Sequence, residues 1–400
     1  MQRISLTDTA IAFCLWQPLQ RLTYHSTSLH CKHIALGSSR LQSRSLIPRG
    51  VDRFARYRMC TSLRRKDVWK ELHVADGYLC LGLTLGTGQT FRFNNFGIQE
   101  RAFPTDKATE DLACEEWAGV IAKYVIALRG EIGGRGRIWW RLVSDCKKGD
   151  LECVEQFVRD YFRADFDYRE VMNGWCRVDA NYQRVFRQGY GKVRLLRQDP
   201  VETLLAFTCS SNNNIKRITG MVQSLALMYG NYICSYEGLD FYEFPNVKQL
   251  LENVSEKDLR ERGFGYRAAF LDKTVKLLHT LGGAKYLQDL RTVEDPEAVI
   301  EALIQFSGVG RKVASCVALM SLDKLSVIPV DTHVWQFTSK HYLPKLRGKS
   351  LTSKLHQEIN DFYLKLFGKE AGIAHNALFV ADLNDTSHQV LLQAACADGS

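Results

Sequence analysis

The chain has 400 residues and a mass of 45.6 kDa, which is enough for two or three domains. Its 46% hydrophobic and 24% charged residues are ordinary for a packed globular protein, so a chain that is disordered throughout is excluded. No run of about 18 apolar residues predicts a membrane span. The 12 cysteines include no Cys-x-x-Cys pair, so we predict no zinc ribbon, no iron–sulfur loop and no metal, and dispersed reduced thiols instead.

The net charge of +9 lies entirely in the first 65 residues. They contain 11 basic residues and only two acidic ones, Asp8 and Asp52, whereas the remaining residues are balanced. A leader rich in Arg and Ser and nearly free of acid is typical of a mitochondrial transit peptide. A plain disordered tail, or sequence upstream of a second start at Met59, stays open as an alternative.

The N-terminal part of the balanced chain predicts mixed structure. Residues 78–93 are rich in β-branched and aromatic residues around a glycine-rich turn, which predicts a β-hairpin. Residues 117–128 form another apolar run of strand or helix type, and residues 130–136 predict a loop. Charged, aromatic-rich segments over residues 139–186 favour helices.

From residue 200 onward the pattern is helical. Apolar residues recur at three and four positions from Ile215 to Met228, after a Ser/Asn run that suits a helix N-cap. Further helices are predicted over residues 298–306 and 311–322, and after Asp331. We therefore predict a leader over residues 1–65, a mixed α/β domain over 66–200, a helical domain over 201–385 and a C-terminal tail over 386–400.

The segment Ser307–Gly310 joins two predicted helices through a Gly-Val-Gly turn. Two glycines let backbone N–H groups approach a phosphate closely, and the following helix presents its N-terminus to that phosphate. Gly-x-Gly alone also fits an ordinary turn between helices. The context favours phosphate binding, because residues 309–350 contain seven basic residues and two acidic ones.

Lys312 and Asp331 are the candidate catalytic pair. A lysine in the first turn of a helix opposes the helix dipole, and with partial burial we expect a lowered pKa that frees the amine as a nucleophile. A carboxylate at the start of the next helix caps that helix and stays ionised. In one cleft the two groups suit cleavage at a sugar carbon through a cationic transition state. A capping aspartate and a solvated lysine are the ordinary structural alternative.

Several stretches together resemble a known family. They are VRLLRQDPVETLLAFTCSSNNNIKRITGMV, FSGVGRKVASCVALMSLDK, VIPVDTHVWQF, TLGTGQTFRF, GFGYRAAF and AGIAHNALFVADL, and they span roughly residues 70–385. They resemble the helix-hairpin-helix glycosylases, and among them the eukaryotic-type 8-oxoguanine DNA N-glycosylase/lyases. The resemblance implies an α+β fold, in which an antiparallel β-sheet domain precedes a mainly helical helix-hairpin-helix domain.

The resemblance also implies residue roles. Lys312 would be the Schiff-base nucleophile and Asp331 its electrostatic partner. The residues implied to form the base pocket are Gly88, Cys316, Met320, Pro329, His375 and Phe379. The residues implied to hold DNA are Asn212, Arg217, Tyr266, Arg267, Gly308, Val309, Gly310 and His333. Among these, Tyr266 would wedge the duplex open and the two arginines would hold the cytosine opposite the lesion. Taken without the family, Asn212 fits a cap, and Cys316, Phe379 and His333 fit a core.

Two positions depart from the family pattern. The hairpin has Phe306-Ser307 where Leu-Pro is usual, and we expect little loss there. His375 stands where the family commonly reads the base edge with a glutamine. An imidazole offers one donor or acceptor per nitrogen, so base selectivity depends on its protonation. With an ordinary pKa near ~6.5, lesion binding is expected to weaken below neutral pH.

We therefore expect a bifunctional glycosylase and AP lyase that flips 8-oxoguanine out of duplex DNA opposite cytosine, excises it through Lys312 and cuts the strand by β-elimination. We expect no cofactor, double-stranded DNA as partner, no membrane, a monomer, and a nuclear location with mitochondrial import through the leader. The alternatives are a glycosylase of the same fold for alkylated or other damaged bases, and a non-catalytic helix-hairpin-helix DNA-binding protein.

Overall fold

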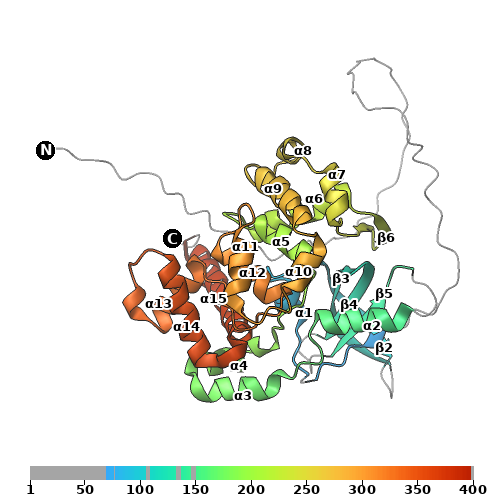
Figure 1. The fold of residues 1–400 in the computed structure, drawn as a ribbon. Helices are drawn as coiled ribbons and strands as arrows, with labels where there is room; N and C mark the ends of the chain where they lie inside the picture. The colour runs from blue at the N-terminus through green and yellow to red at the C-terminus, as the bar shows by residue number, and fades with distance from the viewer. Residues whose placement is uncertain (1–68, 76, 105–108, 132–136, 146–149, 398–400) are drawn as a thin grey trace, which may run out of the picture. The chain divides into compact units, whose positions relative to one another are not determined.

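The computed structural model describes residues 69–397, except residues 76, 105–108, 132–136 and 146–149 (Figure 1). The chain from Trp69 on forms one compact unit. The predicted leader lies outside the described residues, and the predicted domain division at residue 200 stays a prediction. Within the described ranges, no helix has the length and apolar character needed to cross a membrane.

A five-stranded antiparallel sheet forms the N-terminal layer, in the order β1-β5-β4-β3-β2. Its strands are β1 (Lys70–Glu71), β2 (Asn94–Pro104), β3 (Thr109–Ile121), β4 (Tyr124–Glu131) and β5 (Ile138–Leu142). In β4, Ile126 and Leu128 face the helix α2 (Asp150–Tyr161), while the alternate residues Val125 and Ala127 face the hairpin β6–β7. Both faces are thus covered. The prediction of helix was wrong over β5.

The predicted hairpin over residues 78–93 is also wrong. That segment forms a short helix, α1 (Leu81–Leu85), followed by bends, and β2 begins only at Asn94. Leu81, Thr84 and Leu85 lie at helical spacing and are all buried. Thr84 is fixed further because its hydroxyl accepts a hydrogen bond from the backbone N–H of Arg194 at 3.2 Å. Burial on one helical face therefore outweighs the strand propensity of the segment.

The rest of the described chain is mainly helical. Its elements are α3 (Tyr168–Val178), α4 (Ala180–Arg187), α5 (Pro200–Thr208), α6 (Ile215–Tyr229), the hairpin β6 (Tyr232–Tyr236) and β7 (Leu239–Tyr242), α7 (Val247–Asn253), α8 (Glu256–Glu261), α9 (Arg267–Thr280), α10 (Ala284–Asp289), α11 (Pro296–Ile304), α12 (Arg311–Ser321), α13 (Thr332–His341), α14 (Ser353–Phe367) and α15 (Ala371–Ala397). The helices predicted from Ile215, over residues 298–306 and 311–322, and after Asp331 are confirmed. The sequence did not predict β6–β7.

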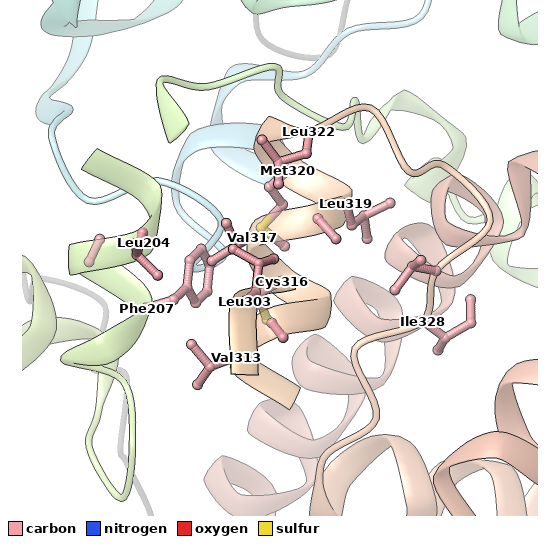
Figure 2. Packing of buried hydrophobic residues seen from close by; sticks show 14 of the residues in the cluster. Leu204, Phe207, Leu303, Val313, Cys316, Val317, Leu319, Met320, Leu322 and Ile328 are labelled. Atoms are coloured by element: carbon pink, nitrogen blue, oxygen red, sulfur yellow. The ribbon is translucent and has the colours of Figure 1, made fainter. Parts of the chain in front are cut away.

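Helix α12 runs through the middle of the main hydrophobic core. Every residue from Val313 to Ser321 is buried. Figure 2 shows Leu204 and Phe207 of α5 beside Val317 and Cys316 of α12. A helix that is apolar nearly all round packs against partners on every side. Only the first turn of α12 has side chains that are not buried. The core therefore fixes where that first turn lies.

Buried polar contacts join the segment after α2 to the chain after α4 and after α12. The fully buried Arg194 donates to the carbonyls of Phe162 at 2.9 Å and Phe166 at 2.8 Å. Beyond the C-terminal end of α12, Asp323 forms ion pairs with Arg163 and Arg197, both at 2.8 Å. These arginines lower the pKa of Asp323 to about 2 against the effect of its burial. The far end of α12 is thus anchored by charge, and its first turn by packing.

Candidate active site

The turn between α11 and α12 is shaped by a close backbone approach. Gly308 has φ +77°, and a Cβ there would lie 2.4 Å from Cδ2 of Phe270 on α9. Phe306 and Val309 are buried on either side, and the N–H of Val309 donates to the carbonyl of Phe306 at 3.1 Å. Only glycine fits position 308, because both the dihedral and the space exclude a side chain.

The first turn of α12 has no side chain that caps it. Gly310 occupies the N-cap and makes no side-chain hydrogen bond, whereas Asp295, Asn214 and Asp331 cap α11, α6 and α13 with theirs. A Cβ at Gly310 would meet nothing within 4 Å. N–H groups without a side-chain acceptor, at the positive end of a helix dipole, suit an anion such as a phosphate.

Lys312 follows in that turn and lies close to two acidic groups. Its ammonium interacts electrostatically with the thiol of Cys316 one turn later and with the Asp331 carboxylate. The Nζ atom lies 5.8 Å from the centroid of the Phe207 ring. The pKa of Lys312 is raised by its electrostatic interaction with Cys316 first and with Asp331 as a further cause, and burial opposes both.

The expectation of a lowered lysine pKa is therefore wrong, because the interactions with the acidic groups of Cys316 and Asp331 outweigh the effect of burial. Burial also raises the pKa of the Cys316 thiol. At neutral pH the negative charge that persists beside the ammonium is consequently that of Asp331. The free protein holds Lys312 as an ammonium, which must lose a proton before it can act as a nucleophile.

Asp331 is both a cap and a neighbour of Lys312. Its side chain accepts a hydrogen bond from the N–H of Val334 at 3.0 Å at the start of α13. The segment before it is held by Asn360, whose amide oxygen accepts from the N–H of Ile328 at 2.9 Å. The structural alternative of a capping aspartate is correct, and the same carboxylate also faces the lysine.

His375 lies on α15 and is 5% exposed. Burial lowers the pKa of its imidazole to about 4, although Asp331 acts to raise it. The ring is stacked with Phe379 at 6.2 Å between centroids and meets Tyr363 edge-on at 5.5 Å. The expected titration near neutral pH is therefore wrong, because a buried imidazole stays neutral down to about pH 4.

The other predicted pocket residues divide into two groups. Cys316, Met320 and Pro329 are buried beside the lysine helix and the segment before Asp331. Gly88 instead lies at Ile215, the first residue of α6, and its φ of +87° with a Cβ only 3.0 Å from Ile215 Cδ1 again excludes a side chain. His333 is exposed at the start of α13, so it is not a core histidine.

Four of the predicted DNA-contact residues, Asn212, Arg217, Tyr266 and Arg267, lie where two loops meet, whereas His333 lies apart from them at the start of α13. The Tyr266 hydroxyl donates to the carbonyl of Ser211 at 2.8 Å, and Arg267 donates to the carbonyl of Asn212 at 2.8 Å. The exposed Arg217 donates to the carbonyl of Gly263 at 3.1 Å. Asn212 is not the cap of α6, since Asn214 is, and its φ of +46° puts it at an exposed turn.

Arg267 differs from its neighbours because it is only 2% exposed. Its guanidinium also lies over the Tyr266 ring at 4.5 Å, and its Nε has no hydrogen-bond partner in the described part of the chain. Arg267 thus braces the loop at residues 211–212, while Arg217 and Tyr266 present exposed groups. Its predicted contact with the opposite base stays a prediction.

Sequence reasoning missed three residues that shape this region. Phe207 lies beneath the lysine, Phe270 fills the space against Gly308, and Tyr363 borders His375. Each belongs to an apolar helical face, so its residue type and spacing predict only a core position. No group of three or more His, Cys, Asp or Glu that could hold a metal ion occurs in the described ranges.

Comparison with known proteins bears directly on this site. The sequence profile of the 8-oxoguanine DNA glycosylase N-terminal domain matches residues 71–204. The N-glycosylase/DNA lyase OGG1 of Arabidopsis thaliana is 37% identical over 327 residues, covering 81% of this chain and 82% of the relative. The N-glycosylase/DNA lyase of Saccharomyces cerevisiae is 32% identical over 341 residues, covering 79% and 87%.

Solved structures agree with these relatives. The Clostridium acetobutylicum 8-oxoguanine glycosylase/lyase, in complex with double-stranded DNA containing cytosine opposite 8-oxoguanine, is 26% identical with a TM-score of 0.62. It covers 80% of this chain and 99% of its own. The Archaeoglobus fulgidus 3-methyladenine DNA glycosylase has a TM-score of 0.56 at 18% identity, over 78% of this chain and 98% of its own, and shares the fold. The chain belongs to the family of 8-oxoguanine N-glycosylase/DNA lyases.

Proposed function

We propose that the protein excises 8-oxoguanine from duplex DNA and then cuts the strand at the resulting site. The observation that carries this proposal is a lysine amine in the uncapped first turn of α12, facing the Asp331 carboxylate. A DNA-binding hairpin needs no nucleophile at that position, and the 37% identical relative is itself named an N-glycosylase/DNA lyase. An enzyme is therefore favoured over a non-catalytic hairpin protein.

The reaction follows from these two groups. After Lys312 loses a proton, its lone pair attacks C1′ of the flipped nucleotide, and the C1′–N9 bond electrons leave with the base, which is then protonated. Opening of the sugar ring gives an imine to the lysine. Loss of a C2′ proton then expels the 3′ phosphate by β-elimination, and water releases the enzyme. Asp331 stabilises positive charge at the sugar throughout.

DNA binding uses two regions described above. The uncapped N–H groups after Gly308 suit a backbone phosphate beside the lysine. The exposed Tyr266, Asn212 and Arg217 suit the gap left by the flipped nucleotide and the cytosine opposite it. A guanidinium donates to the O2 and N3 acceptors of cytosine, whereas adenine presents an amino group that leaves a donor unsatisfied.

Base selection falls to His375 in this proposal. Its imidazole makes no hydrogen bond within the described part of the chain, which leaves its ring nitrogens for a ligand. With a pKa of about 4, the ring is neutral and offers one donor and one acceptor. Oxidised guanine presents the donors N1–H and the 2-amino group, which an acceptor nitrogen can receive.

The relatives support a repair enzyme that acts on nuclear DNA. Mitochondrial import through the basic leader and a monomeric state are further parts of the proposal.

A borohydride trapping experiment tests the proposal. Wild-type protein incubated with a duplex containing 8-oxoguanine opposite cytosine should form a covalent complex on reduction of the imine. Lys312→Gln should still bind the duplex and form none, and the exposed Lys365→Gln on α14 serves as a matched control that traps as wild type. Undiminished trapping by Lys312→Gln would remove this lysine from the mechanism.

A further inference from the structure

We propose that Tyr363 is a positioning residue that sets His375 against the catalytic carboxylate and thereby makes base selection depend on the α13–α14 contact. The inference rests on the proposed role of His375 in reading the base. His375 contacts the rings of Tyr363 and Phe379 but makes no hydrogen bond within the described residues. Its orientation therefore depends on the two rings that touch it.

Those two rings are held differently. Phe379 lies one turn further along α15 and is only partly buried, so it moves with the helix that carries His375. Tyr363 comes from α14 and is completely buried. Its ring meets the imidazole at 71°, an edge-to-face geometry that fixes the plane of one ring relative to the other. Tyr363 therefore lies in a fixed position and sets the orientation of the imidazole ring.

Tyr363 is in turn tied to α13 through its hydroxyl. The Tyr363 hydroxyl and Thr338 Oγ1 lie 2.9 Å apart in a buried hydrogen bond. Thr338 lies on α13, the helix that Asp331 caps, seven residues after that carboxylate. The hydrogen bond between Tyr363 and Thr338 therefore connects α13, which begins at Asp331, with the ring that orients His375.

Packing around Tyr363 leaves this hydrogen bond as its specific restraint. Its ring stacks on Phe367 at 6.0 Å and meets Tyr342 edge-on at 5.7 Å. These contacts fill space and persist when the hydroxyl is removed. Loss of the hydroxyl alone would let the ring shift relative to α13 while the core stays filled, so selectivity should change before stability does.

The test compares Tyr363→Phe, Thr338→Val and the double variant, each in the Lys312→Gln background so that binding is measured without cleavage. Tyr182→Phe is the matched control, because its hydroxyl is equally buried and has no hydrogen-bond partner among the described residues. Equilibrium binding is measured to duplexes with 8-oxoguanine or guanine opposite cytosine. We expect Tyr363→Phe and Thr338→Val each to reduce the 8-oxoguanine preference by about 5-fold or more, equivalent to roughly 1 kcal/mol. The double variant should lose no more than either single one.

His375→Ala separates the possible failures. If it leaves the preference unchanged, His375 does not read the base and the inference falls together with that part of the proposed function. If it abolishes the preference while Tyr363→Phe and Thr338→Val match Tyr182→Phe, only the positioning role of Tyr363 is overturned. A fall in melting temperature with an unchanged preference would likewise mark Tyr363 as a core residue only.

Discussion

Two regions of the molecule that we propose to act on the same DNA are built in opposite ways. Around Lys312 the functional groups are buried or half-buried, and charge and ring contacts hold them within the free protein. Around Asn212 the loops at residues 211–214 and 263–266 are tied together through backbone carbonyls, and side chains remain exposed. Chemistry at a sugar carbon requires preorganised charge, whereas a gap in a duplex is filled by groups that reach outward. We expect substitutions of Lys312 and Asp331 to alter the rate of excision. We expect substitutions in the second region to alter discrimination of the base opposite the lesion.

The largest expected effect concerns the carboxylate. Asp331→Asn keeps the volume and most of the cap on α13 but removes the negative charge beside Lys312. We expect single-turnover excision to fall by at least ~10²-fold, about 2.7 kcal/mol of transition-state stabilisation, with little loss of DNA affinity. A rate equal to wild type would reduce Asp331 to a helix cap.

The lysine itself predicts a pH dependence. Its raised pKa means that the amine is a minor species at neutral pH and that each unit of pH below that pKa costs tenfold in amine. The single-turnover excision rate should rise about tenfold per pH unit between about pH 6 and 8 where chemistry is limiting. A flat profile over that range would show that the amine is already deprotonated in the DNA complex.

Discrimination of the opposite base probes the exposed region. Arg217→Gln removes the exposed guanidinium, and we expect the preference for cytosine over adenine opposite the lesion to fall by at least ~10-fold, as a lost 1–3 kcal/mol contact predicts. Excision opposite cytosine should change less. Competition between the two duplexes measures this ratio, and an unaltered ratio would leave Arg217 as a loop brace like Arg267.

The stability of the hairpin can be tested by comparing alanine substitutions at its two glycines, Gly308 and Gly310. Gly308→Ala needs φ +77° and a Cβ 2.4 Å from Phe270, so the melting temperature should fall by several degrees, consistent with a loss of about 1–3 kcal/mol. Gly310→Ala has an ordinary φ and open space, and it should leave stability nearly unchanged. Equal stability of the two variants would contradict the packing described for the turn.

The smallest expected effect concerns the pH dependence of lesion binding, which we expect to be nearly absent above pH 5.5. With the His375 pKa lowered to about 4, lesion binding should stay level from pH 8.5 to 5.5 and weaken only as pH falls toward 4. His375→Gln should remove that acid limb. A loss of binding centred near pH 6.5 in wild type alone would mean that His375 is solvated in the DNA complex.

The sequence predicted the parts whose signal is local or shared with relatives. Spacing located α6, α11, α12 and the N-cap at Asp331, and the resemblance singled out Lys312 and His375. It did not predict β5 or α1, because aromatic and β-branched residues suit both strands and buried helices, and only tertiary contacts decide between them. The direction of the Lys312 pKa was missed for the same reason, since it depends on two side chains brought close by folding.

Phe270 has a consequence that reaches beyond its place in the core. Its side chain fills the space that Gly308 leaves open, and its ring meets Tyr266 edge-on at 5.6 Å between centroids. The proposed phosphate contact at the hairpin and the proposed wedge Tyr266 therefore pack against the same side chain. We expect a substitution of Phe270 to disturb both proposed contacts with DNA together.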